Sequence, residues 1–249
     1  ESLNLSIGHG HSPVLMAGPC SVESEAGIFE AAAMIQKAHG KLLRGGAFKP
    51  RSSPYSFAGH GRRALDWLHA AATAHELGVV TEVMNPHDVD AVCQVADLIQ
   101  IGSRNMQNYS LLHAVGRAGK VVLLKRGVAA TIEEWLMAGE HLLNAGAKSV
   151  VFCERGIRSF GTETRNLLDL SAVALLSQVY GLPVIVDPSH AVGRRDLIQP
   201  MAAAALAAGA HGLLVESHPA PGKALSDGPQ ALPENELNQL STLLRGLAQ

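Results

Sequence analysis

The sequence predicts a single domain folded as a (β/α)8 barrel, the TIM-barrel fold. Three observations support this prediction. Eight short apolar runs alternate with longer segments of helical periodicity. The apolar runs show little alternation between polar and apolar residues, which is typical of parallel strands buried on both faces. Glycines follow most of the helical segments, where helices commonly end. Eight strand–helix units in succession indicate a closed parallel barrel.

The expected strands are rich in Val, Leu and Ile. In chain order they are residues 14–17, 41–44, 79–83, 98–101, 120–125, 149–153, 183–187 and 212–216. An open doubly wound sheet is the alternative arrangement of such units, but no Gly-x-Gly-x-x-Gly turn follows the first strand.

The expected helices occupy the segments between these strands. They are residues 24–39, 61–77, 87–94, 107–118, 131–145, 163–180, 194–208 and 233–248. Thr131 and Glu134 have the spacing of a capping box, and Pro233 suits a first helical position. Residues 1–13 precede the first strand and are a candidate cap for the barrel, within one domain spanning 1–249.

Composition excludes several classes of protein. The 249 residues are 47% apolar, which is enough for one large core. Lys and Arg number 20 against 22 Asp and Glu, so no strong positive field exists to recruit nucleic acid or a membrane surface. Three scattered cysteines do not form a disulfide framework, and no signal peptide or long apolar span is evident. We therefore expect a cytoplasmic protein.

Polar and charged residues follow almost every expected strand. Catalytic residues of barrel enzymes gather at the carboxyl ends of the strands, so these groups are expected to converge on one active site. The stretch after the second strand places Arg44, Lys49 and Arg51 among glycines and a proline. Such a stretch is either a solvated basic loop or a clamp for anionic oxygens.

Four residues at the ends of the first, seventh and eighth strands could bind a metal ion: Cys20, His190, Glu216 and Asp227. These strands are neighbours in a closed barrel. Mixed sulfur, nitrogen and oxygen ligands suit Mn, Fe, Co or Zn better than Ca or Mg. The alternative is a core cysteine and a loop-capping histidine. Glu82 and Asp187 are candidates for carboxylates that orient cations or water behind the site.

Eight cations are also expected to face this site: Arg44, Lys49, Arg51, Arg104, Lys125, Arg126, Arg155 and Arg158. They would repel one another unless a multiply anionic ligand neutralised them, so two or more anionic groups are expected in the substrates. Arg126 and Arg158 are the two that we interpret as structural salt-bridge partners.

The strand ends closely resemble those of the 3-deoxy-D-arabino-heptulosonate 7-phosphate (DAHP) synthase family, in its type I-beta branch. The resemblance extends from about Val14 onward and includes seven ordered motifs. They are residues 17–21 (AGPCS), 44–52 (RGGAFKPRS), 102–108 (GSRNMQN), 124–127 (LKRG), 153–156 (CERG), 187–190 (DPSH) and 216–228.

The resemblance implies a transferase of the shikimate pathway that condenses phosphoenolpyruvate with erythrose 4-phosphate and releases phosphate. The residues matching the family's metal ligands are Cys20, His190, Glu216 and Asp227. Those matching its phosphoenolpyruvate site are Arg44, Lys49, Arg104, Lys125 and Arg155. Arg51 and Ser52 match the site for the phosphate of erythrose 4-phosphate. Lys49 is the candidate proton donor, and Cys20 and His190 are catalytic through the divalent metal.

Other functions remain open at this point. The sister family that makes 3-deoxy-D-manno-octulosonate 8-phosphate (KDO8P) from arabinose 5-phosphate typically has Lys-Ala-Asn-Arg where this chain has Lys-Pro-Arg-Ser. A non-catalytic sensor would lack some ligands, and none is missing. The chain is either a bare barrel, insensitive to aromatic amino acids, or the catalytic part of a larger protein. By analogy with the family we expect a homo-oligomer, a tetramer or a dimer.

Overall fold

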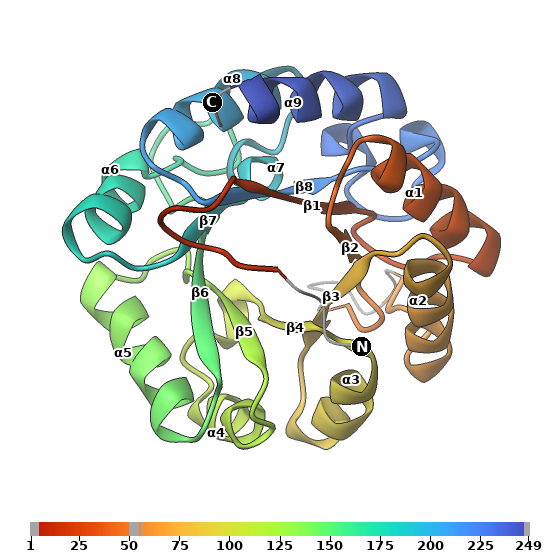
Figure 1. The fold of residues 1–249 in the computed structure, drawn as a ribbon. Coiled ribbons are helices and arrows are strands. Elements are labelled where there is room, and N and C mark those ends of the chain that lie inside the picture. Colours follow the sequence, from red (N-terminus) through yellow and green to blue (C-terminus); the bar gives the residue numbers. More distant parts are fainter. Residues whose placement is uncertain (1–4, 50–54, 56, 247–249) are drawn as a thin grey trace.

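The protein is a closed barrel of eight parallel strands surrounded by helices, as Figure 1 shows. The computed structural model describes residues 5–49, 55 and 57–246. The strands follow one another around the barrel in chain order, and β1 closes it by pairing with β8. The predicted fold is therefore confirmed, and the open-sheet alternative is wrong.

All eight predicted strands are present, with ends shifted by at most one residue. They are β1 (Val14–Gly18), β2 (Leu42–Arg44), β3 (Gly78–Val83), β4 (Leu98–Ile101), β5 (Val121–Lys125), β6 (Ser149–Glu154), β7 (Val184–Val186) and β8 (Gly212–Glu216). The register of β1 against β8 pairs Val14 with Gly212 and Gly18 with Glu216. The carboxyl ends of these two strands therefore meet at the same level.

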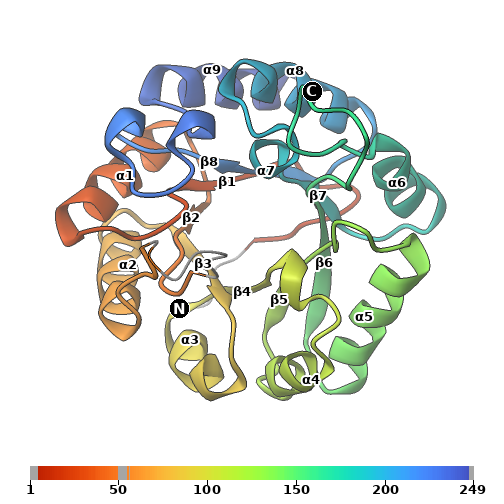
Figure 2. The same cartoon turned by 180° about the vertical axis from the view of Figure 1, so that it is seen from behind.

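The helices form the outer layer of the barrel, except the short helix of residues Pro188–Val192, which lies inside their ring beside β7 (Figures 1 and 2). They are α1 (Glu25–Lys37), α2 (Arg62–Ala74), α3 (Val89–Val95), α4 (Tyr109–Arg117), α5 (Ile132–Asn144), α6 (Leu170–Ala174), α7 (Pro188–Val192), α8 (Ile198–Ala207) and α9 (Glu234–Gly246). The predicted capping box begins α5: Thr131 N–H donates to Glu134 Oε2 at 2.8 Å, and Glu134 N–H donates to Thr131 Oγ1 at 3.1 Å.

The helix predicted over 163–180 begins late, at Leu170, and its last turn over Leu175–Val179 is π-helical. Residues 163–169 form a loop because their backbone groups bond elsewhere. Leu167 and Ile157 exchange antiparallel backbone hydrogen bonds, and the amides of Arg165 and Asn166 donate to carbonyls of α7. Helical periodicity in the sequence does not report such competing hydrogen bonds.

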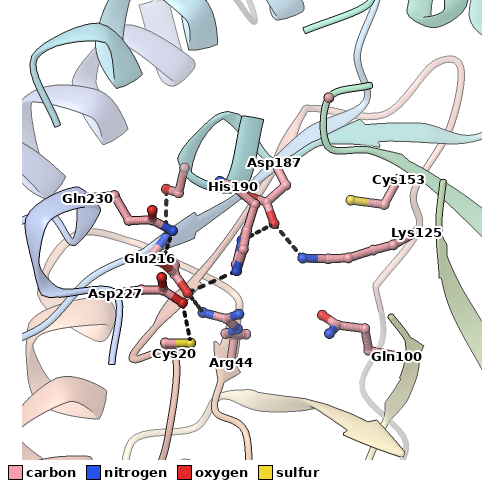
Figure 3. Close-up of polar contacts among 12 residues, drawn as sticks. Cys20, Arg44, Gln100, Lys125, Cys153, Asp187, His190, Glu216, Asp227 and Gln230 are labelled. Carbon is pink, nitrogen blue, oxygen red and sulfur yellow. Dashed lines mark hydrogen bonds and ion pairs between the residues drawn. The ribbon is translucent and has the colours of Figure 1, made fainter. Parts of the chain in front are cut away.

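The short helix α7 follows β7 directly and was not predicted. It starts at Pro188, and Asp187 caps it by accepting a hydrogen bond from the amide of His190. A five-residue helix is too short to produce a periodic pattern. Its effect on the site is large, since it turns His190 toward Glu216 (Figure 3).

Two apolar layers hold the barrel together. The larger lies between strands and helices, and the smaller fills the barrel interior with side chains such as Met16, Leu123 and Ile185. Leu5 and Ile7 of the lead-in pack against the interior layer. The lead-in, drawn in red, crosses the end of the barrel seen in Figure 1. Because it runs directly into β1, this end holds the amino ends of the strands, and the carboxyl ends lie at the opposite end, seen in Figure 2. Within the described residues, no helix has both the length and the apolar composition to cross a bilayer.

Candidate metal and substrate site

A cavity of about 620 Å³ opens at the carboxyl ends of the strands. Its lining comes from almost every strand end and is mostly charged or polar. The residues are Cys20, Arg44, Lys49, Glu82, Gln100, Gly102, Ser103, Arg104, Lys125, Val128, Arg155, Arg158, Arg165, Asn166, His190 and Asp227. Convergence of these groups on one barrel face agrees with the expectation from the strand ends.

One side of the cavity holds the four predicted metal ligands. One atom each from Cys20, His190, Glu216 and Asp227 lies within 4.8 Å of all the others. Cys20 Sγ is 3.0 Å from Asp227 Oδ2, and His190 Nε2 is 3.2 Å from Glu216 Oε1 (Figure 3). One thiol, one imidazole and two carboxylates around a shared centre fit a borderline divalent cation such as Mn, Fe, Co or Zn.

Gly18 allows a close backbone approach between the end of β1 and the end of β2, just before Cys20. Gly18 has a φ of +146°, and a Cβ there would lie 1.9 Å from the carbonyl oxygen of Arg44. Only glycine fits such an approach. Two residues later the chain presents Cys20 beside Asp227, which itself adopts a left-handed conformation with φ of +51°.

Burial and neighbouring charges shift the pKa values of two ligands in opposite directions. Burial, reinforced by Glu216, raises the pKa of the Cys20 thiol to about 11. Burial alone would also raise the pKa of Asp227. The Cys20 hydrogen bond and the charges of His190, Arg165 and Lys49 outweigh it and lower the pKa of Asp227 to about 2. The site is therefore rich in negative charge once the thiol ionises.

Asp187 supports both the metal cluster and the cationic side of the cavity. Its Oδ2 lies 2.7 Å from His190 Nδ1 and also accepts a hydrogen bond from Lys125 (Figure 3). Burial opposes ionisation, but His190 and Lys125 hold the pKa of Asp187 well below its usual range. Burial lowers the pKa of His190 despite its carboxylate neighbours. A neutral imidazole whose Nδ1 bonds to a carboxylate leaves Nε2 free to bind a metal.

Glu216 is held by three further groups. Its Oε1 is 2.8 Å from the guanidinium of Arg44, its Oε2 accepts a hydrogen bond from Gln230, and its amide donates to Ser189 Oγ at 3.0 Å. Burial opposes ionisation of Glu216, but His190 and Arg44 lower its pKa. The carboxylate is thus charged and fixed in orientation before any ligand arrives.

The predicted phosphoenolpyruvate residues also line this cavity, namely Arg44, Lys49, Arg104, Lys125 and Arg155. Arg44 and Lys125 form buried ion pairs with Glu216 and Asp187. Lys49, Arg104 and Arg155 have no carboxylate partner among the residues that the structure describes. Lys49 Nζ instead donates to the carbonyl of Cys20 at 2.7 Å. Arg51 and Ser52 lie outside the described residues.

The two arginines interpreted as structural have different positions. Arg126 is buried and pairs with Glu154 at 3.1 Å and Asp169 at 2.8 Å, as expected of a structural residue. Arg158 is exposed, lines the cavity, and forms no ion pair with any described residue. The described residues therefore give no support to the structural interpretation of Arg158.

Sequence reasoning missed several polar residues of the site. Gln230 and Arg165 contact the metal ligands, and Gln100 and Ser103 each have a buried oxygen without a hydrogen-bond partner among the described residues. Gln100 lies inside an apolar strand, and Arg165 lies in a segment predicted to be helical. The sequence offered one signal for these residues: Gln230 lies three residues after the predicted metal ligand Asp227.

Comparison with known proteins gives consistent results. The model of the DAHP synthetase I family matches residues 1–249. The phospho-2-dehydro-3-deoxyheptonate aldolase of Thermotoga maritima is 48% identical over 245 residues, which cover 98% of this chain and 72% of the relative. A 2-dehydro-3-deoxyphosphooctonate aldolase of Acidithiobacillus ferrooxidans is 34% identical, over 96% of this chain and 90% of the relative.

Solved structures agree with these sequence matches. The crystal structure of the Thermotoga maritima aldolase, also called DAHP synthase, superposes with a TM-score of 0.94 at 47% identity, covering 98% of this chain and 72% of that one. A truncated form of the Thermotoga maritima synthase gives a TM-score of 0.91 at 44% identity, covering 98% and 89%. The chain belongs to the DAHP synthetase I family.

Proposed function

We propose that this protein is a DAHP synthase, the enzyme of the first step of the shikimate pathway. It condenses phosphoenolpyruvate with erythrose 4-phosphate and water, and forms DAHP and inorganic phosphate. One observation carries the proposal: a four-ligand metal cluster and five cations lie together at one cavity. The reaction needs both. Cations suit the phosphate and carboxylate of phosphoenolpyruvate, and a metal suits the aldehyde of erythrose 4-phosphate.

The cations are suited to phosphoenolpyruvate, which carries a phosphate and a carboxylate. Lys49, Arg104 and Arg155 have no carboxylate partner among the described residues and are available to these groups. Burial lowers the pKa of Arg155, and a bound anion would favour its charged form. Arg44 and Lys125 complete the grip while they stay paired with Glu216 and Asp187.

The cluster of Cys20, His190, Glu216 and Asp227 would hold a divalent metal ion. When bound there, the ion would supply a Lewis acid for the aldehyde of erythrose 4-phosphate. Asp187 keeps the His190 ring in one orientation, and Arg44 and Gln230 fix Glu216. These contacts place the ligand atoms before the metal binds, which reduces the cost of assembling the site.

The bond changes assign roles to the cationic side chains. The methylene carbon of phosphoenolpyruvate bonds to the aldehyde carbon, and water adds to the neighbouring carbon. The phosphate then leaves that tetrahedral carbon, which becomes a ketone. Preorganised Arg and Lys donors stabilise the charge on the departing phosphate. Lys49, whose Nζ donates to the Cys20 carbonyl at 2.7 Å, is the candidate to give a proton to the aldehyde oxygen, which then becomes the new hydroxyl.

The identity of the aldose acceptor rests on two observations. Identity to the Thermotoga maritima heptonate aldolase is 48%, against 34% for the octonate aldolase of Acidithiobacillus ferrooxidans. The chain also has Lys-Pro-Arg-Ser at 49–52, where Arg51 and Ser52 match the erythrose 4-phosphate site of the resembled family. Both favour the four-carbon over the five-carbon sugar phosphate.

Phosphate release from phosphoenolpyruvate tests the proposal. Purified protein is assayed with erythrose 4-phosphate and with arabinose 5-phosphate, in each case after chelation and after adding back Mn, Fe, Co or Zn. We expect release with erythrose 4-phosphate, lost on chelation and restored by metal. Preference for arabinose 5-phosphate would make the protein a KDO8P synthase, and activity unaffected by chelation would exclude the metal cluster from the reaction.

A further inference from the structure

Arg165 joins the metal cluster from a part of the chain that supplies none of its ligands. It lies in the loop between β6 and α6. Its NH2 group is 3.3 Å from Asp227 Oδ1, and its NH1 group is 3.2 Å from Gln230 Oε1. Gln230 in turn donates its amide hydrogen to Glu216 Oε2. One guanidinium therefore contacts one metal ligand directly and a second through a buried amide.

The backbone around Arg165 is hydrogen-bonded to α7, the helix that carries the metal ligand His190. The amides of Arg165 and Asn166 donate to the carbonyls of Val192 and Ala191 at 3.0 and 2.8 Å. Asn166 Nδ2 also donates to the carbonyl of His190 at 3.0 Å. These hydrogen bonds attach the loop to α7.

Two glycines allow this close packing. A Cβ at Gly193 would lie 2.7 Å from the Cβ of Arg165, and a Cβ at Gly156 would lie 2.7 Å from the Cβ of Asn166. Both glycines also have positive φ values, +69° and +89°. Side chains at these two positions would collide with the loop, so the glycines let the loop pack where Arg165 reaches the metal cluster.

We propose that Arg165 is a positioning residue of the metal centre, which sets the geometry of Asp227 and, through Gln230, of Glu216. The inference rests on the proposed function in that it assumes a metal at this cluster. A guanidinium suits the role because its planar fork can donate to two acceptors at once in fixed directions. Supporting residues of this kind typically change metal affinity by about ten- to a hundredfold.

A competing role for Arg165 is to bind substrate, since it also lines the cavity and is half exposed. The two roles differ in what they change. A substrate-binding cation would alter the KM of an anionic substrate and leave metal affinity unchanged. A positioning residue would alter metal affinity without any substrate present.

The test measures Co²⁺ binding to substrate-free protein by competition with a chelator and by the thiolate-to-cobalt absorption of Cys20. Three variants are compared with the wild-type protein: Arg165→Ala, Arg165→Lys and Arg117→Ala. The last removes an exposed cation at the end of α4, outside the cavity lining, and is the charge-matched control. Unfolding temperatures of the metal-free proteins show whether each variant is folded.

We expect Arg165→Ala to bind Co²⁺ about ten- to a hundredfold more weakly with an altered absorption band. Arg165→Lys should recover only part of this loss, because an ammonium lacks the two-pronged donor. Arg117→Ala should match the wild-type protein. Wild-type affinity and spectrum in a folded Arg165→Ala would overturn the positioning role while leaving the metal centre intact. A wild-type protein that binds no Co²⁺ would overturn the metal centre and the inference with it.

Discussion

The guanidinium of Arg44 lies 2.8 Å from Oε1 of Glu216, and both side chains are almost entirely buried. This ion pair connects the two sets of site residues, since Arg44 is one of the predicted phosphoenolpyruvate residues and Glu216 belongs to the metal cluster. Two charges held together without water are costly to separate, because the remaining partner keeps its desolvation penalty.

Arg44→Ala should therefore destabilise the chelated protein by about 3–5 kcal/mol, as expected when one partner of a buried pair is removed. The measurement is urea unfolding in the presence of a chelator. Lys37→Ala is the control, because the Lys37–Glu234 pair is exposed and its loss should cost at most about 1 kcal/mol. Equal effects of the two substitutions would show that the buried pair contributes no more than a surface one.

Cys20→Ala should abolish tight metal binding, because the thiolate is the one sulfur ligand of the cluster. Metal affinity should fall by about a hundredfold or more, beyond the usual effect of a supporting residue. Activity should fall in parallel and recover only at high metal concentration. The matched control is Cys93→Ala, because Cys93 is a half-buried cysteine of α3 that does not belong to the metal cluster. A Cys20→Ala protein with full metal content and activity would contradict the ligand assignment.

Arg51→Ala should weaken the binding of erythrose 4-phosphate more than that of phosphoenolpyruvate. If Arg51 binds the phosphate of erythrose 4-phosphate, losing a charged hydrogen bond of about 1.5–3 kcal/mol should raise the KM of that sugar about ten- to a hundredfold. The KM of phosphoenolpyruvate should change little. Steady-state kinetics with each substrate varied in turn gives both values. Arg62→Ala, on the exposed start of α2, serves as the control, and a larger change for phosphoenolpyruvate would reassign Arg51.

His211 should make the stability of the barrel depend on pH. It is buried beside β7, its Nδ1 accepts a hydrogen bond from the amide of Val184, and its ring contacts that of His9 at 4.6 Å. Burial, followed by the charge of His9, lowers the pKa of His211 below its ordinary 6.5. The unfolded chain therefore binds this proton first, and stability should fall as the pH drops below about 6.5.

Chemical unfolding of the wild-type protein and of His211→Asn between pH 8 and pH 5 checks this expectation. Asparagine offers an acceptor near the position of Nδ1 but does not titrate, so its stability curve should be flatter over this range. His69→Asn, on the outer face of α2, controls for the loss of a histidine. Identical pH profiles for wild-type protein and His211→Asn would show that His211 is not the group responsible.

The four ligands of the cluster illustrate how far sequence reasoning reaches. Cys20, His190, Glu216 and Asp227 follow strands one, seven and eight, and the closure of β1 on β8 brings them together. Strand order and strand ends are local properties that apolar runs reveal. The convergence of the ligands then follows from the barrel itself, because parallel strands present all their carboxyl ends on one face.

Arg165 and Gln230 illustrate what sequence reasoning could not reach. Their contacts depend on a loop that leaves the helical path because its amides bond to α7, and on a glutamine with no charge or pattern to distinguish it. The sequence by itself determined the barrel, the strand ends and the types of chemical group placed there. Only the tertiary structure decided which of these groups support one another, because hydrogen bonds between distant loops have no signature in local periodicity.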